Sequence, residues 1–170
     1  MTQPAIFNHY AFEAAEKAQL DQDGHFILPG LLTERACKNL TAALSTIQDM
    51  ADSGEYDPQP NRYSAEYSPY LESLIVHPQM LHLARQVLGD EIRFDHCATL
   101  NRRNDFNGMN WHSHAYAEDK PKLGFVRIFF YVNGFSPGDG GLKVVPGSHH
   151  FRDPRIHADT DAELEATWLA

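Results

Sequence analysis

Apolar residues recur at intervals of three and four in the segment that follows Thr33, which predicts an amphipathic helix with one buried stripe. Thr33 is a preferred helix-capping residue, and Glu34 adds a favourable negative charge in the first turn. The stripe contains Ala36, Cys37, Leu40, Ala43, Leu44, Ile47 and Met50. A second helix is predicted over 79–88, because Pro78 precedes it and Gly89 follows it.

The segments around these helices carry turn signals. Asp23-Gly24 predicts the end of a short amino-terminal helix, and 25–28 predicts a brief strand that runs into a Pro29-Gly30 turn. Residues 53–69 lack a period and predict a loop. Its tyrosines either line a cleft or attach the loop to the body of the protein.

The pattern changes to a period of two from Ile92 onward. Alternate apolar positions predict a strand over about ten residues that ends near Leu100. The run 125–133 carries the strongest strand signal in the chain. One of its faces is purely apolar, whereas the other mixes aromatic and polar residues.

Helices followed by consecutive strands with short turns predict an α+β chain whose second half is an antiparallel barrel or sandwich. The chain has 170 residues and is expected to form one domain. Within it, 1–90 is predicted to be mainly helical, 91–150 to supply the barrel strands and 151–170 to form a tail.

Composition narrows the choice of partners. The formal charge of −9 and the sequence pI near 5.5 argue against nucleic acid and anionic membranes, which attract basic surfaces. The amino terminus has no pattern of a secretory signal, and no apolar stretch approaches bilayer length. We therefore expect a cytoplasmic protein with a small-molecule ligand. Cys37 and Cys97 are expected to be buried thiols rather than a disulfide.

The segment 111–114, Trp-His-Ser-His, carries the most specific chemistry. His112 and His114 stand two residues apart, so in an extended strand their side chains point to the same face. Two imidazoles on one face can hold one metal ion.

The chain resembles the phytanoyl-CoA dioxygenase family in four motifs that occur in the family's order. They are the 23–30 turn and strand, the 77–90 helix with its Leu-Gly-Asp end, the 111–114 histidine strand and the 146–149 Pro-Gly-Ser-His turn. The resemblance implies a double-stranded β-helix, or jelly roll, with amino-terminal helices. It also implies iron(II) near the mouth of the barrel and 2-oxoglutarate as cosubstrate.

The resemblance assigns His112 to the first histidine ligand, whereas His114 stands where the family has an aspartate. It places the second histidine of the family, and the arginine that binds 2-oxoglutarate, on strands beyond Ala170. The barrel is therefore expected to be incomplete at its carboxyl end. Unpaired strand edges would then favour a homo-oligomer.

Three interpretations of His114 remain open. It ligates the metal as a third imidazole, or it lines the cleft while Glu118, Asp119 or water completes the coordination shell of the metal. Alternatively, both strand histidines are ordinary residues without metal. His149 and His150 belong to the Pro-Gly-Ser-His turn, which the resemblance implies is a structural corner.

The mixed face of 125–133 would place Arg127, Phe129 and Tyr131 in a cosubstrate or substrate cleft, where a guanidinium can pair with a carboxylate. Asn101, with Arg102 and Arg103 beside it, is a second candidate for this cleft. The alternative for the arginines is simple exposure to solvent.

The resemblance thus implies an iron(II), 2-oxoglutarate-dependent dioxygenase that hydroxylates a small organic substrate. We expect the 170 residues by themselves to be inactive. Two alternatives remain. The chain is a non-catalytic jelly-roll module, or it is a three-histidine iron oxygenase that does not use 2-oxoglutarate. Neither the substrate nor the oligomeric state follows from the sequence.

Overall fold

The computed structural model describes residues 5–101, 110–113, 124–134, 141–151 and 155–169. The chain divides into two compact units. The first unit comprises Met1–Glu13, Ile27–Arg103 and Ile128–Phe135. The second unit comprises Ala14–Phe26, Asn104–Arg127 and Ser136–Ala170.

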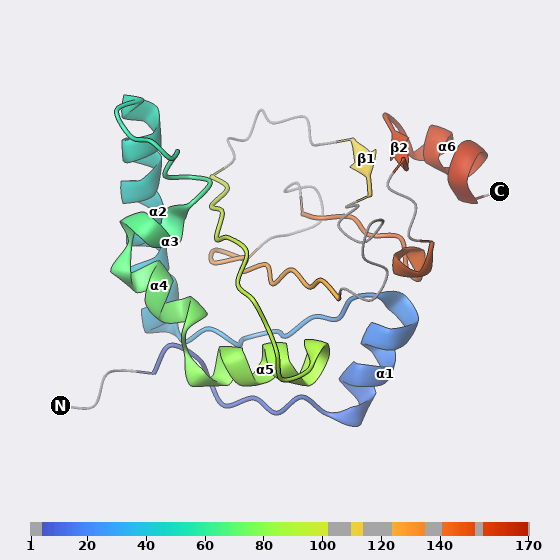
Figure 1. Ribbon diagram of the computed structural model, residues 1–170, viewed down its shortest axis with the longest axis horizontal. Coiled ribbons are helices and arrows are strands. Elements are labelled where there is room, and N and C mark those ends of the chain that lie inside the picture. Colours follow the sequence, from blue (N-terminus) through green and yellow to red (C-terminus); the bar gives the residue numbers. More distant parts are fainter. Residues whose placement is uncertain (1–4, 102–109, 114–123, 135–140, 152–154, 170) are drawn as a thin grey trace. The chain divides into compact units, whose positions relative to one another are not determined.

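Four helices build the first unit (Figure 1). They are α2 (Glu34–Ser53), α3 (Ser64–Tyr67), α4 (Pro69–Ile75) and α5 (Pro78–Leu88). The predicted helices after Thr33 and Pro78 are both confirmed. Thr33 Oγ1 accepts a hydrogen bond from Ala36 N at 3.1 Å, as a helix cap should.

The buried stripe of α2 is also confirmed, since Ala36, Leu40 and Ile47 are buried. Together with side chains from α4, α5 and the amino-terminal segment they form the core of this unit. The other core residues are Phe7, Leu71, Leu74, Met80 and Leu83. Phe7 belongs to an isolated antiparallel bridge with Leu32, which ties the amino-terminal segment to the residues before α2.

The predicted loop over 53–69 is partly wrong. It contains α3, and α4 begins at Pro69, which occupies a first-turn position. Ser68 Oγ accepts a hydrogen bond from Leu71 N at 3.4 Å and so caps α4. Residues 54–63 remain without helix or strand.

The second unit contains α1 (Ala14–Asp23), β1 (Trp111–His112), η1 (Ser148–His150), β2 (His157–Ala158), α6 (Asp161–Leu164) and η2 (Glu165–Leu169). The predicted helix end at Asp23-Gly24 is confirmed, because α1 ends at Asp23 and Gly24 has a φ of 77°. Ala158 and Leu164 are the buried apolar residues described in this unit.

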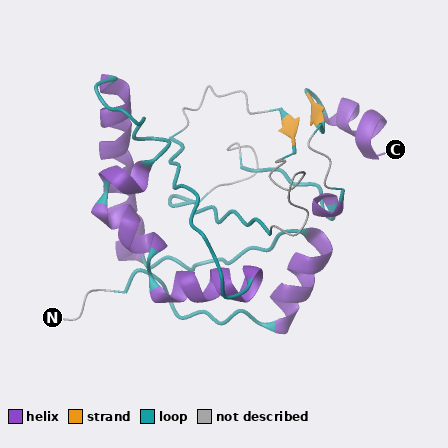
Figure 2. Ribbon diagram, in the orientation of Figure 1, coloured by secondary structure: helices purple, strands orange, loops and turns teal. Residues whose placement is uncertain are grey.

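The predicted strands are largely wrong for the described residues. Segments 25–28, 92–101 and 124–134 carry no strand, and much of the chain outside the helices is drawn as loop in Figure 2. Phe94 and Leu100 are 54% and 65% exposed, so the expected buried face does not form there. Alternating patterns require partner strands, and β1 with β2 is the one two-stranded sheet in the described part of the chain.

Part of the alternation in 125–133 nevertheless survives as a difference in exposure. Val126, Phe130 and Val132 are half-buried, although Ile128 of the same predicted face is 39% exposed. Phe125, Phe129 and Tyr131 of the other face are exposed. Phe130 stacks on Phe7 with a distance of 6.1 Å between the ring centroids. The jelly-roll expectation is thus supported by the structure only in its helical first part and one short strand pair.

No helix in the described residues is long and apolar enough to cross a membrane. Cys37 and Cys97 are free thiols, as predicted, although both are half-buried rather than buried.

Candidate metal centre

The strand that carries the histidine motif is β1, and it pairs with β2 in antiparallel register (Figure 1). Trp111 lies opposite Ala158, and His112 lies opposite His157. The ladder continues by one bond, because Ser113 N donates to Ile156 O at 3.0 Å. The predicted strand at this motif is therefore confirmed over 111–112.

His112 is exposed, and its Nδ1 lies 2.8 Å from the backbone oxygen of Asn110. A carbonyl oxygen can only accept a hydrogen bond, so Nδ1 of His112 is the donor in this contact. Metal-binding histidines are commonly oriented by this kind of bond from the second ring nitrogen. The His112 ring is thus held through Nδ1 by the backbone of Asn110.

Trp111, on the opposite face of the strand, is fixed by a charged pair. Its Nε1 donates to Asp161 Oδ1 at 2.8 Å, and Lys143 Nζ lies 3.0 Å from Asp161 Oδ2. Lys143 Nζ also stands 5.9 Å from the centroid of the Trp111 ring. The hydrogen bond from Trp111, and then the bond and charge of Lys143, lower the pKa of Asp161 below its ordinary value.

The His112 face also carries a polar group that the sequence reasoning does not single out. Asn110 Nδ2 donates to Asp159 Oδ1 at 2.7 Å and lies 3.5 Å from His157 Nε2. His157 Nε2 is in turn 4.0 Å from Asp159 Oδ1. The His-x-Asp spacing at 157–159 is the local sequence signal from which His157 and Asp159 could have been identified as candidates.

The Pro-Gly-Ser-His turn is anchored to the end of α1. Gly147 N donates to Asp23 O at 3.0 Å, and His149 Nε2 donates to Asp21 O at 3.2 Å. The rings of His149 and His150 lie 3.8 Å apart by their centroids. Two of the motifs that carry the family resemblance, the Asp-Gly turn and this turn, therefore contact each other.

The cleft candidates are divided between the two units. Asn101, Phe129 and Tyr131 belong to the first unit, whereas Arg127 and His112 belong to the second. All of the cleft candidates are exposed, and the Arg127 guanidinium carbon lies 5.5 Å from the centroid of the Phe125 ring. The remaining candidates, His114, Arg102, Arg103, Glu118 and Asp119, lie outside the described residues.

The donor chemistry at β1 fits iron(II) as far as the structure describes it. His112 supplies an imidazole, and imidazole is a usual ligand of iron. Within the described ranges, no group of three or more His, Cys, Asp or Glu side chains is arranged to hold a metal ion. The described residues thus include one candidate histidine ligand but not a complete coordination shell.

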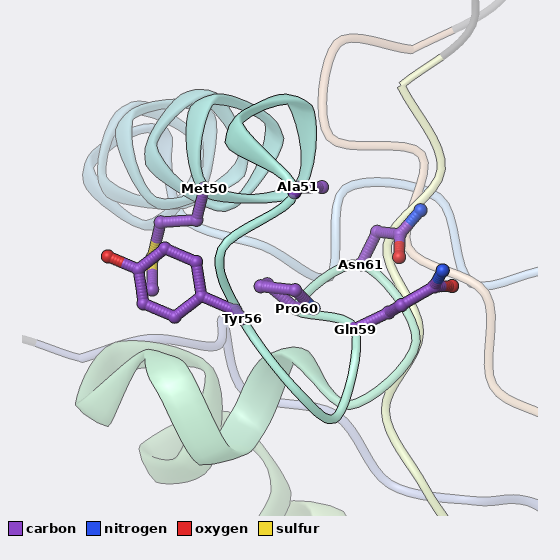
Figure 3. A pocket seen from close by; sticks show the side chains of 7 residues that line it. Met50, Ala51, Tyr56, Gln59, Pro60 and Asn61 are labelled. Carbon is purple, nitrogen blue, oxygen red and sulfur yellow. The ribbon is translucent and has the colours of Figure 1, made fainter.

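A small cavity of about 140 Å³ lies in the first unit, between the end of α2 and the loop that follows it (Figure 3). Met50, Tyr56, Gln59, Pro60 and Asn61 are among the residues that line it. None of the predicted site residues contributes to it.

Comparison with known proteins agrees with the motif resemblance. Residues 20–168 match the family model described as Phytanoyl-CoA dioxygenase (PhyH). The ectoine dioxygenase of Sphingopyxis alaskensis is 28% identical over 160 residues, which cover 84% of this chain and 51% of that protein. The ectoine dioxygenase of Bordetella parapertussis is 26% identical over 155 residues, which cover 82% of this chain and 50% of that protein.

The chain therefore spans about half the length of the curated relatives that it matches. No solved structure matches it. Because the family model covers most of the 170 residues, the chain belongs to the phytanoyl-CoA dioxygenase family.

Proposed function

We propose that the protein is an iron(II), 2-oxoglutarate-dependent dioxygenase that hydroxylates a small organic molecule, as the family membership suggests. The observation that carries the proposal is the orientation of His112 within the matched region. Its Nδ1 donates a hydrogen bond to Asn110 O, and in our proposal Nε2 is the nitrogen that binds the metal. Iron with 2-oxoglutarate supplies oxidation of a C–H bond, while the keto acid becomes succinate and carbon dioxide.

In our proposal, the residues of this chain bind and orient the metal, the cosubstrate and the substrate. In our proposal His112 binds the metal, and His114 binds beside it in place of the family's carboxylate. Arg127 is the proposed partner for a carboxylate or phosphate of the bound substrate, because its guanidinium is permanently charged and can bind such a group through two parallel bonds. Asn101, Phe129 and Tyr131 are proposed to line the cleft around the substrate. The jelly roll is the proposed architecture of the complete enzyme.

Trp111 and Asp161 keep the metal strand in place in this proposal. Their hydrogen bond, reinforced by Lys143, fixes the side of β1 that faces away from His112. A ligand on a short, exposed strand needs such support, because metal affinity depends on the orientation of each ligand.

Ectoine is the first substrate to test, since both named relatives are ectoine dioxygenases. The experiment uses the protein expressed from its complete reading frame, loaded anaerobically with iron(II) and then given 2-oxoglutarate and oxygen. We expect succinate to form only with iron, to increase when a substrate is present and to disappear in His112→Ala. His150→Ala is the matched control, because it removes an imidazole from the Pro-Gly-Ser-His turn instead of the strand.

The two alternatives give different results in the same experiment. Oxygen uptake that needs iron but not 2-oxoglutarate would identify a three-histidine oxygenase and contradict the proposal. Absence of both iron binding and succinate formation would identify a non-catalytic module.

A further inference from the structure

We infer that α1 is a conditional helix that the Pro-Gly-Ser-His turn at 146–149 caps from a distance, so that helix and turn fold and unfold as one local unit. A cap is a group that hydrogen-bonds the backbone at a helix end, and it usually comes from a residue next to the helix. Here the His149 imidazole lies 128 residues along the chain from its partner in α1. The inference is independent of the proposed function, because it involves neither the metal nor the cosubstrate.

The first support is that α1 has little within its own sequence to stabilise it. It has 10 residues, fewer than the roughly 12–15 that even a favourable isolated helix needs in water. None of its residues, all of which the structure describes, is buried, so it lacks the packed apolar face that stabilises most helices in proteins. Its Lys17–Asp21 ion pair is exposed, and exposed pairs stabilise little. Contacts outside the helix therefore decide whether α1 forms.

The second support is the charge at the carboxyl end of α1. Asp21 and Asp23 lie in the last turn, where the helix dipole already places partial negative charge, and that turn holds no basic residue to offset them. The last carbonyl oxygens of a helix also lack partners within the helix itself. This end of α1 therefore needs hydrogen-bond donors from elsewhere.

The third support is that the turn supplies two such donors. Gly147 N donates to Asp23 O at 3.0 Å, and His149 Nε2 donates to Asp21 O at 3.2 Å. A histidine side chain is suited to this role, because it can hydrogen-bond the last carbonyls of a helix. The turn thus provides one backbone cap and one side-chain cap.

The contact between helix and turn is also closely packed. Gly24, directly after α1, has a φ of 77°, and a Cβ atom there would stand 2.5 Å from His149 Nδ1. Gly147 has a φ of 78°, and a Cβ atom there would stand 3.7 Å from Gln22 O. Displacement of the turn would remove both hydrogen bonds and this packing together. We therefore expect α1 and the turn to open as one cooperative unit.

The first test is native-state amide hydrogen exchange, followed by NMR on the unaltered chain. Gly24 N donates to Leu20 O at 2.9 Å and reports on the end of α1, whereas Gly147 N reports on the turn. We expect the protection factors of these two amides to agree within about twofold and to fall in parallel as urea is added. A Gly147 amide that stays protected while the Gly24 amide exchanges freely, or the reverse, would overturn the inference. So would the absence of protection at either amide.

The second test compares three variants of the turn. His149→Ala removes the imidazole donor and should lower the protection of the α1 amides by roughly fivefold, as the loss of one hydrogen bond does. His149→Gln keeps a side-chain N–H donor and should restore most of the protection. His150→Ala is the matched control, because it removes the neighbouring imidazole, 3.8 Å from His149 between ring centroids, and keeps both bonds to α1. It should leave the protection nearly unchanged.

The indole N–H resonance of Trp111 shows whether each variant is folded, because Trp111 Nε1 donates to Asp161 Oδ1 at a different contact of the same unit. It should keep its position in all three variants. Protection of α1 in His149→Ala equal to that of the wild type would overturn the capping role, as would an equal loss in His149→Ala and His150→Ala. The exchange data on the unaltered chain decide the matter if a variant does not fold.

Discussion

Gly24 lies directly against the imidazole of His149, so that a Cβ atom at Gly24 would stand 2.5 Å from His149 Nδ1. Gly24 also has a φ of 77°, which a residue with a side chain adopts only at a cost. The contact joins the end of α1 to the Pro-Gly-Ser-His turn. Both features explain why this position needs a glycine.

Gly24→Ala should therefore destabilise the protein through backbone strain and through the clash with His149. The strain alone is about 1–2 kcal/mol, and the clash adds to it because His149 is held by Asp21 O. Gly30→Ala is the control, since Gly30 has a φ of 66° but a Cβ atom there would meet nothing within 4 Å. Urea unfolding should show a larger loss for Gly24→Ala. Equal losses would show that the His149 contact has no energetic effect.

Protonation of Asp161 should release Trp111. The pKa of Asp161 is lowered in the folded protein, first by the hydrogen bond from Trp111 and then by Lys143. A lowered folded-state pKa means that the interaction is complete above the ordinary value of 3.8 and is lost as the pH falls through the folded-state value. The indole N–H resonance of Trp111 should accordingly shift only in that acidic range.

Asp161→Asn should abolish this acidic transition of the Trp111 resonance, because the amide has no proton to gain there. Glu165→Gln, a change of the same kind in η2, should preserve the transition. A transition that persists unchanged in Asp161→Asn would mean that another group controls the environment of Trp111.

Exposed apolar side chains should make the 170-residue chain associate at high concentration. Ile27, Phe94 and Leu100 are 74%, 54% and 65% exposed, and such side chains favour contacts between molecules. The double variant Phe94→Ser and Leu100→Ser should lower the average mass measured by light scattering. A monomer at all concentrations, with no effect of the two serines, would contradict this prediction.

The 170 residues by themselves should not convert 2-oxoglutarate to succinate above background. The resemblance assigns neither the family's second histidine nor its 2-oxoglutarate arginine to a residue of this chain, which spans about half the length of its curated relatives, so we expect the keto acid to lack its carboxylate anchor. The measurement is succinate after incubation with iron(II) and oxygen. Formation of succinate that a chelator abolishes would show that Arg127 or another arginine within the chain supplies the anchor.

Local signals in the sequence predict α1, α2 and α5, but not α3, α4 and α6. Thr33 and Pro78 mark helix starts through short-range hydrogen bonding and fixed φ, and Gly89 marks a helix end. These effects operate within a few residues and do not depend on distant partners. The helix at Pro69–Ile75 escapes prediction because the aromatic, proline-rich composition around it is more typical of a loop.

Strands and the candidate site are harder to predict, because both depend on residues far apart in the sequence. The alternation in 92–100 is that of a strand, but without a paired neighbour Phe94 and Leu100 stay exposed. His112 is identified by its motif. The position of His157 opposite His112 is not predicted, since it follows from the register of two strands.

The central claim is that the Trp111–His112 strand holds the metal, and anaerobic titration with iron(II) tests it most directly. Wild type, His112→Ala, His114→Asp and His150→Ala should be compared by calorimetry. We predict that His112→Ala loses most of the affinity, that His150→Ala keeps it, and that His114→Asp binds iron more tightly because a carboxylate suits a hard divalent ion. Equal affinities in all four proteins would contradict the claim and leave His112 as an ordinary strand residue.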